Sequence, residues 1–344
     1  MNNDIVKELE EKEVQEAPRK KSKEQVKKER EINARLVQLS KRNRENLGIV
    51  AIEPNDNVIS LDNGYFVKIY SLKGVELTQN RKNVLVNSLL EFTEHRIRLS
   101  SFKYESTSSS LVFLSVYFPG ESYAEVIDEI NEFDQNIVNL MKNKFKVSFN
   151  ICSVGEVFMF AYMNFNGQMK RIDDSAILKR SANLRKDFFQ DVSEFEGGFY
   201  IPQNGKYGEC IMALQYPDKL KGNVFDAVKR INKGYLSCID FQRVSEEDFN
   251  SYEDVLNASF NTSVRHDFKN MVNITFVFGF LYDSKDILFS SKLHLRNALA
   301  ETGMVFAPCN GIQRNVYESL ASMGIYDFHC MRTVNSEIIS NLIG

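Results

Sequence analysis

The 344-residue sequence contains no tryptophan and only four histidines, six prolines and five cysteines. The cysteines are scattered, with no Cys-x-x-Cys pair, so the sequence predicts neither a disulfide framework nor a thiolate metal site. No histidine lies three or four residues from another. These absences argue against the common histidine and cysteine metal motifs, and the cysteine usage indicates a reducing, cytosolic compartment.

Motifs of nucleotide-dependent and nucleophilic catalysis are missing as well. No Gly-x-x-x-x-Gly-Lys-Ser/Thr loop, whose backbone amides would hold phosphates, occurs in the chain. The nearest stretch, Gly205–Gly208, has the wrong spacing and precedes a strand, so we interpret it as a turn. No Gly-x-Ser-x-Gly elbow marks a nucleophile, and we interpret Cys309 and Cys330 as packing residues. The sequence therefore predicts no catalytic residue, no cofactor and no metal.

Long hydrophobic runs are also scarce. The N-terminal residues show no apolar core of a signal peptide, so we expect no export by that route. The most hydrophobic stretch, Met271–Tyr282, has twelve residues, whereas a membrane-spanning helix needs about 20. We predict that this stretch is a buried strand, and that any link to a membrane comes through partners or the protein surface.

Charge is unevenly distributed, although the net formal charge is only −3. Residues 19–44, here called the basic arm, contain eleven lysines and arginines against three glutamates, a net charge of +8. The rest of the chain has 32 basic and 43 acidic residues, a net charge of −11. A basic arm on an acidic body can contact anionic lipid, nucleic acid or the acidic surface of a partner.

The basic arm lies in a polar stretch of helix-favouring residues with few apolar anchors, so we expect a charged N-terminal helix over residues 1–46. A merely solubilising extension is the alternative. The arm contains no aromatic residue to stack on bases, which leaves only phosphate contact for nucleic-acid binding. The candidate contacts with a partner or an anionic surface are Arg19, Lys20, Lys21, Lys23, Lys27, Lys28, Arg30, Lys41, Arg42 and Arg44.

The 43% apolar content is enough for sizeable cores, and the pattern after residue 46 predicts strands and helices in alternation. Asp62-Asn63-Gly64 indicates a tight hairpin turn, because Asn-Gly tolerates positive φ. We expect an antiparallel sheet covered by two helices. The expected sheet segments are Val58–Leu61, Tyr65–Leu72, Arg96–Lys103, Leu111–Phe118, Phe145–Cys152 and Val157–Met163, and the expected helices are Val84–Phe92 and Glu121–Lys142.

A second block repeats this order of elements after a polar bridge and a helix near residues 174–192. The predicted fold class is therefore α+β, with two successive antiparallel sheet-plus-helix blocks, ferredoxin-like or related, at 47–170 and 171–344. In the second block the expected strands are Gly208–Tyr216, Tyr235–Val244, Met271–Tyr282 and Met304–Pro308, and the expected helices are Val224–Ile231, Ser245–Phe260 and Ser284–Glu301.

The C-terminal residues resemble a known family. From Gln313 the chain reads Gln-x-x-x-Tyr-x-Ser-Leu-x-x-x-Gly, and Arg-Thr-x-Asn-Ser follows at 332–336. This pattern resembles the segment that joins the two halves of the large conjugative type IV secretion ATPases. The residues that carry the resemblance are Gln313, Tyr317, Ser319, Leu320, Gly324, Arg332, Thr333 and Ser336.

Three further stretches resemble the same family in the same order: Gly64–Ile69, Ala213–Pro217 and the helical stretch from Ser291 to Gly303. Two positions depart from the pattern. Ser322 stands where the family usually has Pro, and Ile343-Gly344 stands where a Pro-Phe pair is expected. Because Pro fixes φ and Ser does not, these departures bear on the conformation of the terminal loop.

The resemblance implies the N-terminal, non-motor half of such an ATPase, with ATPase activity belonging to a C-terminal half outside these residues. In the family this half docks the motor to the cytoplasmic side of a membrane channel and to its neighbours in a hexamer. Our hypothesis is a non-catalytic assembly component of a conjugation machine, an oligomer located in the cytoplasm and peripherally at the inner face of the membrane. Its partners would be other channel subunits and a motor ATPase.

Two other functions remain open: a nucleic-acid-binding accessory protein of a mobile element, and an enzyme with a dispersed site. For the terminal segment, the alternative is that Val316, Tyr317 and Leu320 are only the buried face of a closing helix, with Arg332 a surface charge.

Overall fold

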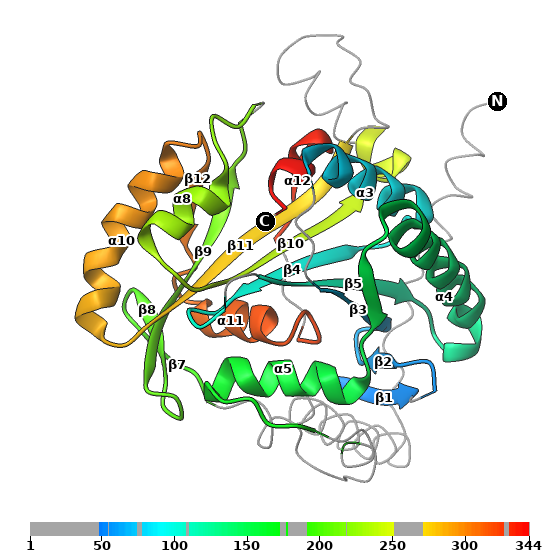
Figure 1. Cartoon of the computed structure of the whole chain (residues 1–344), viewed down its shortest axis with the longest axis horizontal. Coiled ribbons are helices and arrows are strands. Elements are labelled where there is room, and N and C mark those ends of the chain that lie inside the picture. Colours follow the sequence, from blue (N-terminus) through cyan, green and yellow to red (C-terminus); the bar gives the residue numbers. More distant parts are fainter. Residues whose placement is uncertain are drawn as a thin grey trace, which may run out of the picture. The chain divides into compact units, whose positions relative to one another are not determined.

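The computed structural model describes residues 48–53, 55–73, 78–107, 110–172, 177, 191–217, 219–250, 271–326 and 330–343. All of these lie in one compact unit, Asn43–Gly344. The basic arm, the predicted N-terminal helix, and most of the helices predicted at 174–192 and 245–260 lie outside the described residues. The α+β class is confirmed, because an antiparallel sheet and eight helices make up the described part of the chain (Figure 1).

The first half of the sheet and its helices come from the chain before residue 170. The hairpin, both predicted helices and the long strands lie close to their expected positions. The strands are β1 (Ile49–Glu53), β2 (Val58–Leu61), β3 (Tyr65–Lys73), β4 (Ile97–Lys103), β5 (Leu111–Pro119) and β6 (Ser148–Ile151), and the helices are α3 (Gln79–Phe92), α4 (Tyr123–Val138), the π-helix η1 (Asn139–Phe145) and α5 (Val154–Asn166).

The second half follows from residue 191, and its four predicted strands and two of its predicted helices are present. Its strands are β7 (Ser193–Phe195), β8 (Gly198–Ile201), β9 (Lys206–Gln215), β10 (Tyr235–Arg243), β11 (Met271–Tyr282), β12 (Val305–Pro308) and β13 (Arg332–Asn335), and its helices are α8 (Val224–Ile231), α10 (Lys285–Ala300), α11 (Gln313–Ala321) and α12 (Glu337–Asn341).

The thirteen strands of the described residues all belong to one sheet rather than to two small ones. The order is β1-β2-β3-β5-β4-β10-β11-β9-β8-β7, with β6 beside β3, β12 beside β9 and β13 beside β11. Strands β4 and β10 join the halves in an antiparallel ladder from Ile97↔Phe241 to Lys103↔Tyr235, which we call the seam. The expectation of two separate sheets is thus corrected. Without the seam, two buried apolar strands would be open edges.

The two halves repeat the same order of elements on either side of the seam. The series β3-α3-β4-β5-α4-β6-α5 corresponds to β9-α8-β10-β11-α10-β12-α11. The pairings correspond too, since β3 and β9 each pair with a preceding hairpin strand and with β6 or β12. Because the equivalent strands β4 and β10 run antiparallel, an approximate twofold relation passes through the seam.

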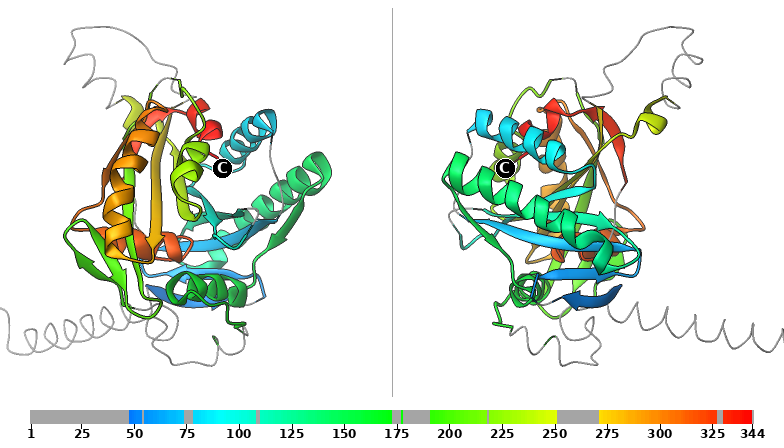
Figure 2. Two further views of the ribbon diagram at one scale, coloured as in Figure 1. Left: turned by 60° about the vertical axis from the view of Figure 1, so that its left-hand side comes forward. Right: turned by 90° about the vertical axis from the view of Figure 1, so that its right-hand side faces the viewer.

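Helices cover both faces of the sheet. Helices α3, α4, α8, α10 and α12 pack on one face, and α5 and α11 lie side by side on the other, where the sheet curves around them (Figures 1 and 2). Alternation along the strands explains this division: in β5, for instance, Leu114 and Val116 face the first layer, whereas Phe113 and Tyr117 face the second. The core is therefore two apolar layers with the sheet between them.

Two local expectations are wrong. Val157–Met163 is not a sheet segment but part of helix α5, which begins with a capping box in which Ser153 and Glu156 bond reciprocally to each other's backbone N–H. The alternation of polar and apolar residues over 96–103 predicts a half-buried strand, but β4 is buried on both faces. Its polar residues Arg98 and Ser100 are as inaccessible as its apolar ones, because α11 and the turn after it cover that face.

Candidate functional site

The family-like residues of α11 fasten this helix to the surrounding elements. Gln313 is buried, and its side chain forms two hydrogen bonds with the backbone of Cys210 in β9. The side-chain oxygen accepts from the Cys210 N–H (2.6 Å) and the side-chain amide donates to the Cys210 carbonyl (3.1 Å), as the backbone of a neighbouring strand would. The Tyr317 hydroxyl donates to the carbonyl of Asn164 at the end of α5 (2.7 Å), and its ring packs on Phe199. These side chains are inside the protein and offer no surface to a ligand.

A buried ion pair crosses the seam beneath α11. The guanidinium of Arg98 in β4 binds Asp240 in β10 through two bonds, Nε to Oδ1 (2.6 Å) and Nη2 to Oδ2 (2.7 Å), and both side chains are fully buried. Its Nη1 also donates to the carbonyl and the hydroxyl of Ser319 (3.1 and 2.8 Å). Burial alone would lower the pKa of Arg98, but the Asp240 carboxylate raises it well above its usual value, so this arginine is charged.

The turn after α11 continues the same contacts. Gly324 has a φ of +88°, and its carbonyl accepts from the Tyr117 hydroxyl in β5 (3.0 Å). A Cβ at Gly324 would lie 1.8 Å from that hydroxyl oxygen, so only glycine fits. Ser322, where the similar family has Pro, donates its backbone N–H to the Glu318 carbonyl (3.1 Å), a bond that Pro would lose. Segment 313–324 thus ties both halves together at the seam.

The remaining family-like residues lie in β13 and at the start of α12. Thr333 pairs with Asn273 of β11 and donates its hydroxyl to the Asn273 side chain (2.8 Å). Arg332 is exposed, whereas Ser336 is 8% exposed. Leu320 is buried on α11, so that of the eight family-like residues Arg332 is exposed, Thr333 is half-buried and the other six are buried. The seam residues Arg98 and Asp240 were not predicted, since a charged residue in an alternating strand normally faces solvent.

The described residues show no assembled catalytic group. Burial raises the pKa of the Cys238 and Cys309 thiols to about 12, and that of Cys210 well above its usual value, so these thiols stay protonated and unreactive. Cys330 is exposed. Within the described ranges no three His, Cys, Asp or Glu residues form a group that could hold a metal ion. Of the stretch Gly205–Gly208, predicted to be a turn, only Gly205 lies in the turn between β8 and β9, and the residues after it begin β9.

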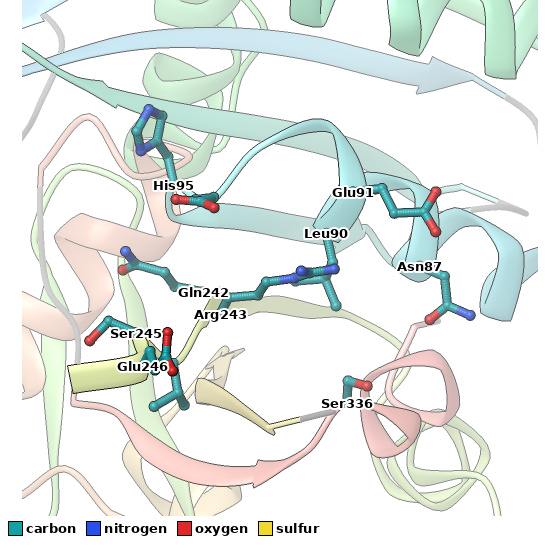
Figure 3. A pocket seen from close by; sticks show the side chains of 11 residues that line it. Asn87, Leu90, Glu91, His95, Gln242, Arg243, Ser245, Glu246 and Ser336 are labelled. Carbon is teal, nitrogen blue, oxygen red and sulfur yellow. The ribbon is translucent and has the colours of Figure 1, made fainter. Parts of the chain in front are cut away.

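An open groove of about 960 Å³ lies where α3 ends, where β10 ends and where α12 begins (Figure 3). Glu91 from α3, Glu94 just after it and Glu246 after β10 line it, together with Arg243 and Ser336. Three acidic groups face one basic group, so the groove is negative. Sequence reasoning missed it because its walls come from segments about 150 residues apart, although acidic residues at a helix C-terminus are a visible anomaly.

A second surface feature is the outward side of α10. Phe289 and Leu293 are 45% and 65% exposed, and Lys285 and Lys292 lie over the Phe289 ring at 5.7 and 4.9 Å from its centroid. We call these four residues the α10 ridge. An ion pair anchors helix α10 to the sheet, because Nζ of Lys292 lies 3.4 Å from Oε1 of the buried Glu209 in β9.

In comparisons with known proteins, no protein-family model and no curated protein matches the chain. No helix among the residues that the structure describes combines the length and the apolarity needed to cross a bilayer.

Proposed function

We propose that this protein is a non-catalytic assembly component of a conjugative type IV secretion machine, corresponding to the non-motor half of its ATPase. Support for the family comes from the order of the four sequence stretches, from Gly64–Ile69 to the terminal segment. Support for an assembly role comes from the surfaces, because the described residues present no group suited to catalysis but do present an apolar ridge. The component would dock at the cytoplasmic face of the transfer channel.

The observation that carries the proposal is the exposure of Phe289 and Leu293 on α10. Large apolar side chains grouped on a surface helix mark protein interaction sites, and the exposed Lys285 beside them adds orientation to such a contact. The helix belongs to one of the stretches that resemble the family, and neither Phe289 nor Leu293 is a member of the buried core. We therefore assign the α10 ridge to contacts with channel subunits or with neighbouring copies.

The basic arm supplies a second contact in this proposal, on sequence grounds alone. Each lysine or arginine near an anionic bilayer contributes about 1 kcal/mol of attraction, reduced by salt and by the three glutamates. Liposome flotation of the full chain and of a chain lacking residues 1–46 tests this contact at low and high salt. Equal flotation of both chains would remove the membrane role of the arm.

The proposed function is tested by mating assays in the strain that carries the gene. Deletion of the reading frame should abolish transfer of the mobile element, and the wild-type gene should restore it. Leu293→Asp should fail to restore transfer although its circular dichroism spectrum is unchanged, whereas the matched surface change Asn297→Asp on the same helix should restore it. Unimpaired transfer in the deletion strain refutes the proposal.

Two assays on the purified protein separate the alternatives. ATP hydrolysis above that of a mock preparation would contradict the non-catalytic assignment. Retention of single- or double-stranded DNA in a gel shift at physiological salt would instead favour an accessory protein that binds nucleic acid, since such binding depends on phosphate contacts.

A further inference from the structure

Strand β6 is an edge of the sheet whose outer side is unpaired in the described part of the chain. It pairs with β3 alone, in a register that places Ile151 opposite Tyr70. The Cys152 N–H donates to the Ile69 carbonyl of β3, and antiparallel strands alternate between hydrogen-bonded and non-hydrogen-bonded pairs. Phe149 and Ile151 therefore direct their backbone N–H and C=O groups away from β3. No described residue forms a hydrogen bond with these outward groups.

The equivalent strand of the second half, β12, carries a proline on this side. β12 pairs with β9 as β6 pairs with β3, and the Cys309 N–H that follows it donates to the Cys210 carbonyl. Pro308 therefore corresponds to Ile151, and it has no N–H to offer on the outer side. Proline at such a position is one of the ways in which proteins prevent unwanted pairing at a sheet edge. Of the two equivalent edges, β6 is the one that keeps both donors.

A groove of about 370 Å³, here called the β6 groove, lies beside this open edge. Residues of α4, η1, β6 and α5 line it: Val138, Lys142, Phe149, Asn150, Ile151 and Glu156. Alternate side chains of a strand share a face, so Ile151 lies on the same face as Phe149, which packs in the core with α4. Phe149 is buried, whereas Ile151 is 37% exposed. The groove therefore has an apolar floor that its own residues leave partly open.

The β6 groove is positively charged. Lys142 lines it, Lys144 and Lys146 follow before β6, and all three are exposed and without an ion-pair partner among the described residues. The C-terminus of η1 carries only about half a negative charge, so three lysines exceed what the helix dipole offsets. The carboxylate of Glu156 is engaged in the capping box, since its Oε2 accepts from the Ser153 N–H (3.0 Å).

We propose that the β6 edge and its groove bind an acidic, extended segment of a partner protein, which adds to the sheet as a strand. Its backbone would exchange hydrogen bonds with Phe149 and Ile151, its apolar side chains would pack on Val138 and Ile151, and its carboxylates would pair with the lysines. A row of alternating backbone donors and acceptors complements another polypeptide strand rather than a nucleic acid or a lipid. The inference rests on the proposed assembly function and names the chemistry of one partner.

The test uses the full chain and a fluorescein-labelled decapeptide of alternating valine and glutamate, with binding followed by fluorescence anisotropy at low salt. Two N-methylated peptides report strand addition, one methylated at every valine nitrogen and the other at every glutamate nitrogen. The N–H groups of alternate residues lie on the same edge of a strand, so only one of these peptides loses the bonds to β6. That peptide should bind at least about tenfold more weakly, and the other about as well as the unmodified one.

A substitution in β6 tests the same contact from the protein side. Ile151→Pro removes an outward N–H but no bond to β3, and it gives β6 the residue that β12 has at Pro308. The variant should keep the circular dichroism spectrum of the wild type and bind the unmodified peptide about tenfold more weakly, because a peptide carbonyl loses its donor.

The positive charge is tested with two triple variants. Binding should weaken about tenfold, and added salt should weaken it in the wild type, when the groove is neutralised by Lys142→Gln, Lys144→Gln and Lys146→Gln. The matched control removes three exposed lysines elsewhere and should change affinity by less than about twofold: Lys219→Gln, Lys221→Gln and Lys233→Gln. A photo-crosslinker in the peptide should label residues 138–151.

Four results would overturn the proposal: equal weakening in both triple variants, equal binding of both N-methylated peptides, crosslinks elsewhere, or no binding by the wild type. A wild type that forms dimers which Ile151→Pro dissociates would overturn it as well, because the occupant would then be a second copy of the chain.

The outcome is separable from the proposed function. If deletion of the gene abolishes transfer while both triple variants bind the peptide equally, the assignment of the β6 groove is wrong and the assembly role stands. If the β6 groove binds the peptide selectively but deletion leaves transfer intact, the site stands and the conjugative role is wrong.

Discussion

The buried ion pair at the seam gives the sharpest prediction about stability. Arg98 and Asp240 are both fully buried and lie opposite each other in the β4–β10 ladder. Arg98→Met would leave the Asp240 carboxylate uncompensated in the interior, and Asp240→Leu would leave the buried Arg98 guanidinium without its carboxylate while it keeps its bonds to Ser319. Each single change should therefore cost far more than the pair contributes as a whole.

The expected magnitudes follow from burial. Removing one partner of a buried pair destabilises by about 3–5 kcal/mol, and the lost bonds from Arg98 to Ser319 belong to the upper part of that range. The double variant carries apolar side chains of similar volume and leaves no buried charge, so its cost should stay within about 2 kcal/mol of the wild type. The coupling free energy between the two positions should accordingly exceed about 3 kcal/mol.

Urea unfolding followed by circular dichroism measures these values, since the chain has no tryptophan to report by fluorescence. The matched control is Glu301→Gln, because the Arg230–Glu301 pair has a similar separation of 3.1 Å but is 61% and 66% exposed, and its loss should cost less than about 1 kcal/mol. The reasoning would be refuted if the single seam variants lost no more free energy of unfolding than this control. It would also be refuted if the loss in the double variant equalled the sum of the losses in the two single variants.

Three further predictions concern the segment at the seam and the thiols. Gly324→Ala should destabilise by about 2–5 kcal/mol in the same assay, because this position combines a φ of +88° with a clash against the Tyr117 hydroxyl. The control Gly205→Ala, with a φ of +66° and no atom within 4 Å of the added Cβ, should cost about 1 kcal/mol. Equal costs for the two variants would contradict the packing argument. Ellman's reagent should modify all five thiols in denaturant but only one of them, Cys330, quickly in the native protein. Cys330→Ser should therefore abolish the fast phase of the reaction. The pKa of Cys238 is raised from 9.0 to about 12 in the folded state. The contribution of this thiol to the free energy of unfolding should therefore be full below pH 9 and fall by up to about 1.4 kcal/mol per pH unit as the pH rises toward 12. In Cys238→Ala the free energy of unfolding should decline less steeply with alkaline pH, and an unchanged decline would count against burial of the thiol.

Much of the local structure was predictable because it depends on local patterns. The bounds expected for α8 and β11 coincide with the observed ones, since apolar periodicity and flanking polar turns define both elements. Helix α5 was missed although Ser153 and Glu156 form a capping box that the sequence displays, and a short apolar run by itself does not distinguish strand from helix.

The joined sheet could not be predicted in this way. Alternation along a strand assigns two faces but says nothing about which distant strand lies beside it, and β4 and β10 are about 140 residues apart. From the sequence alone, Arg98 and Asp240 would be assigned to the solvent-facing side of their strands. In the structure the terminal segment 313–324 covers that side. The groove depends in the same way on three separate segments, so its acidic character emerges only from the assembled fold.

The same ion pair also bears on why these two strands pair in only one way. In the observed register Arg98 lies opposite Asp240; a shift by two residues would place Arg98 opposite Cys238 or Gln242 and leave a buried charge without its partner. Pairing of β4 with a second copy of β4 would likewise bury two unpaired arginines. Since β4 and β10 are equivalent strands of two similar halves, pairing of β4 with a second copy of β4 would be favourable if the two strands carried no buried charge. We therefore expect the Arg98→Met, Asp240→Leu double variant to fold stably but to form dimers on refolding at high concentration, measured by light scattering after size exclusion. If the wild type is monomeric and the double variant is monomeric as well, the apolar pattern and the chain connectivity alone specify the pairing of β4 with β10.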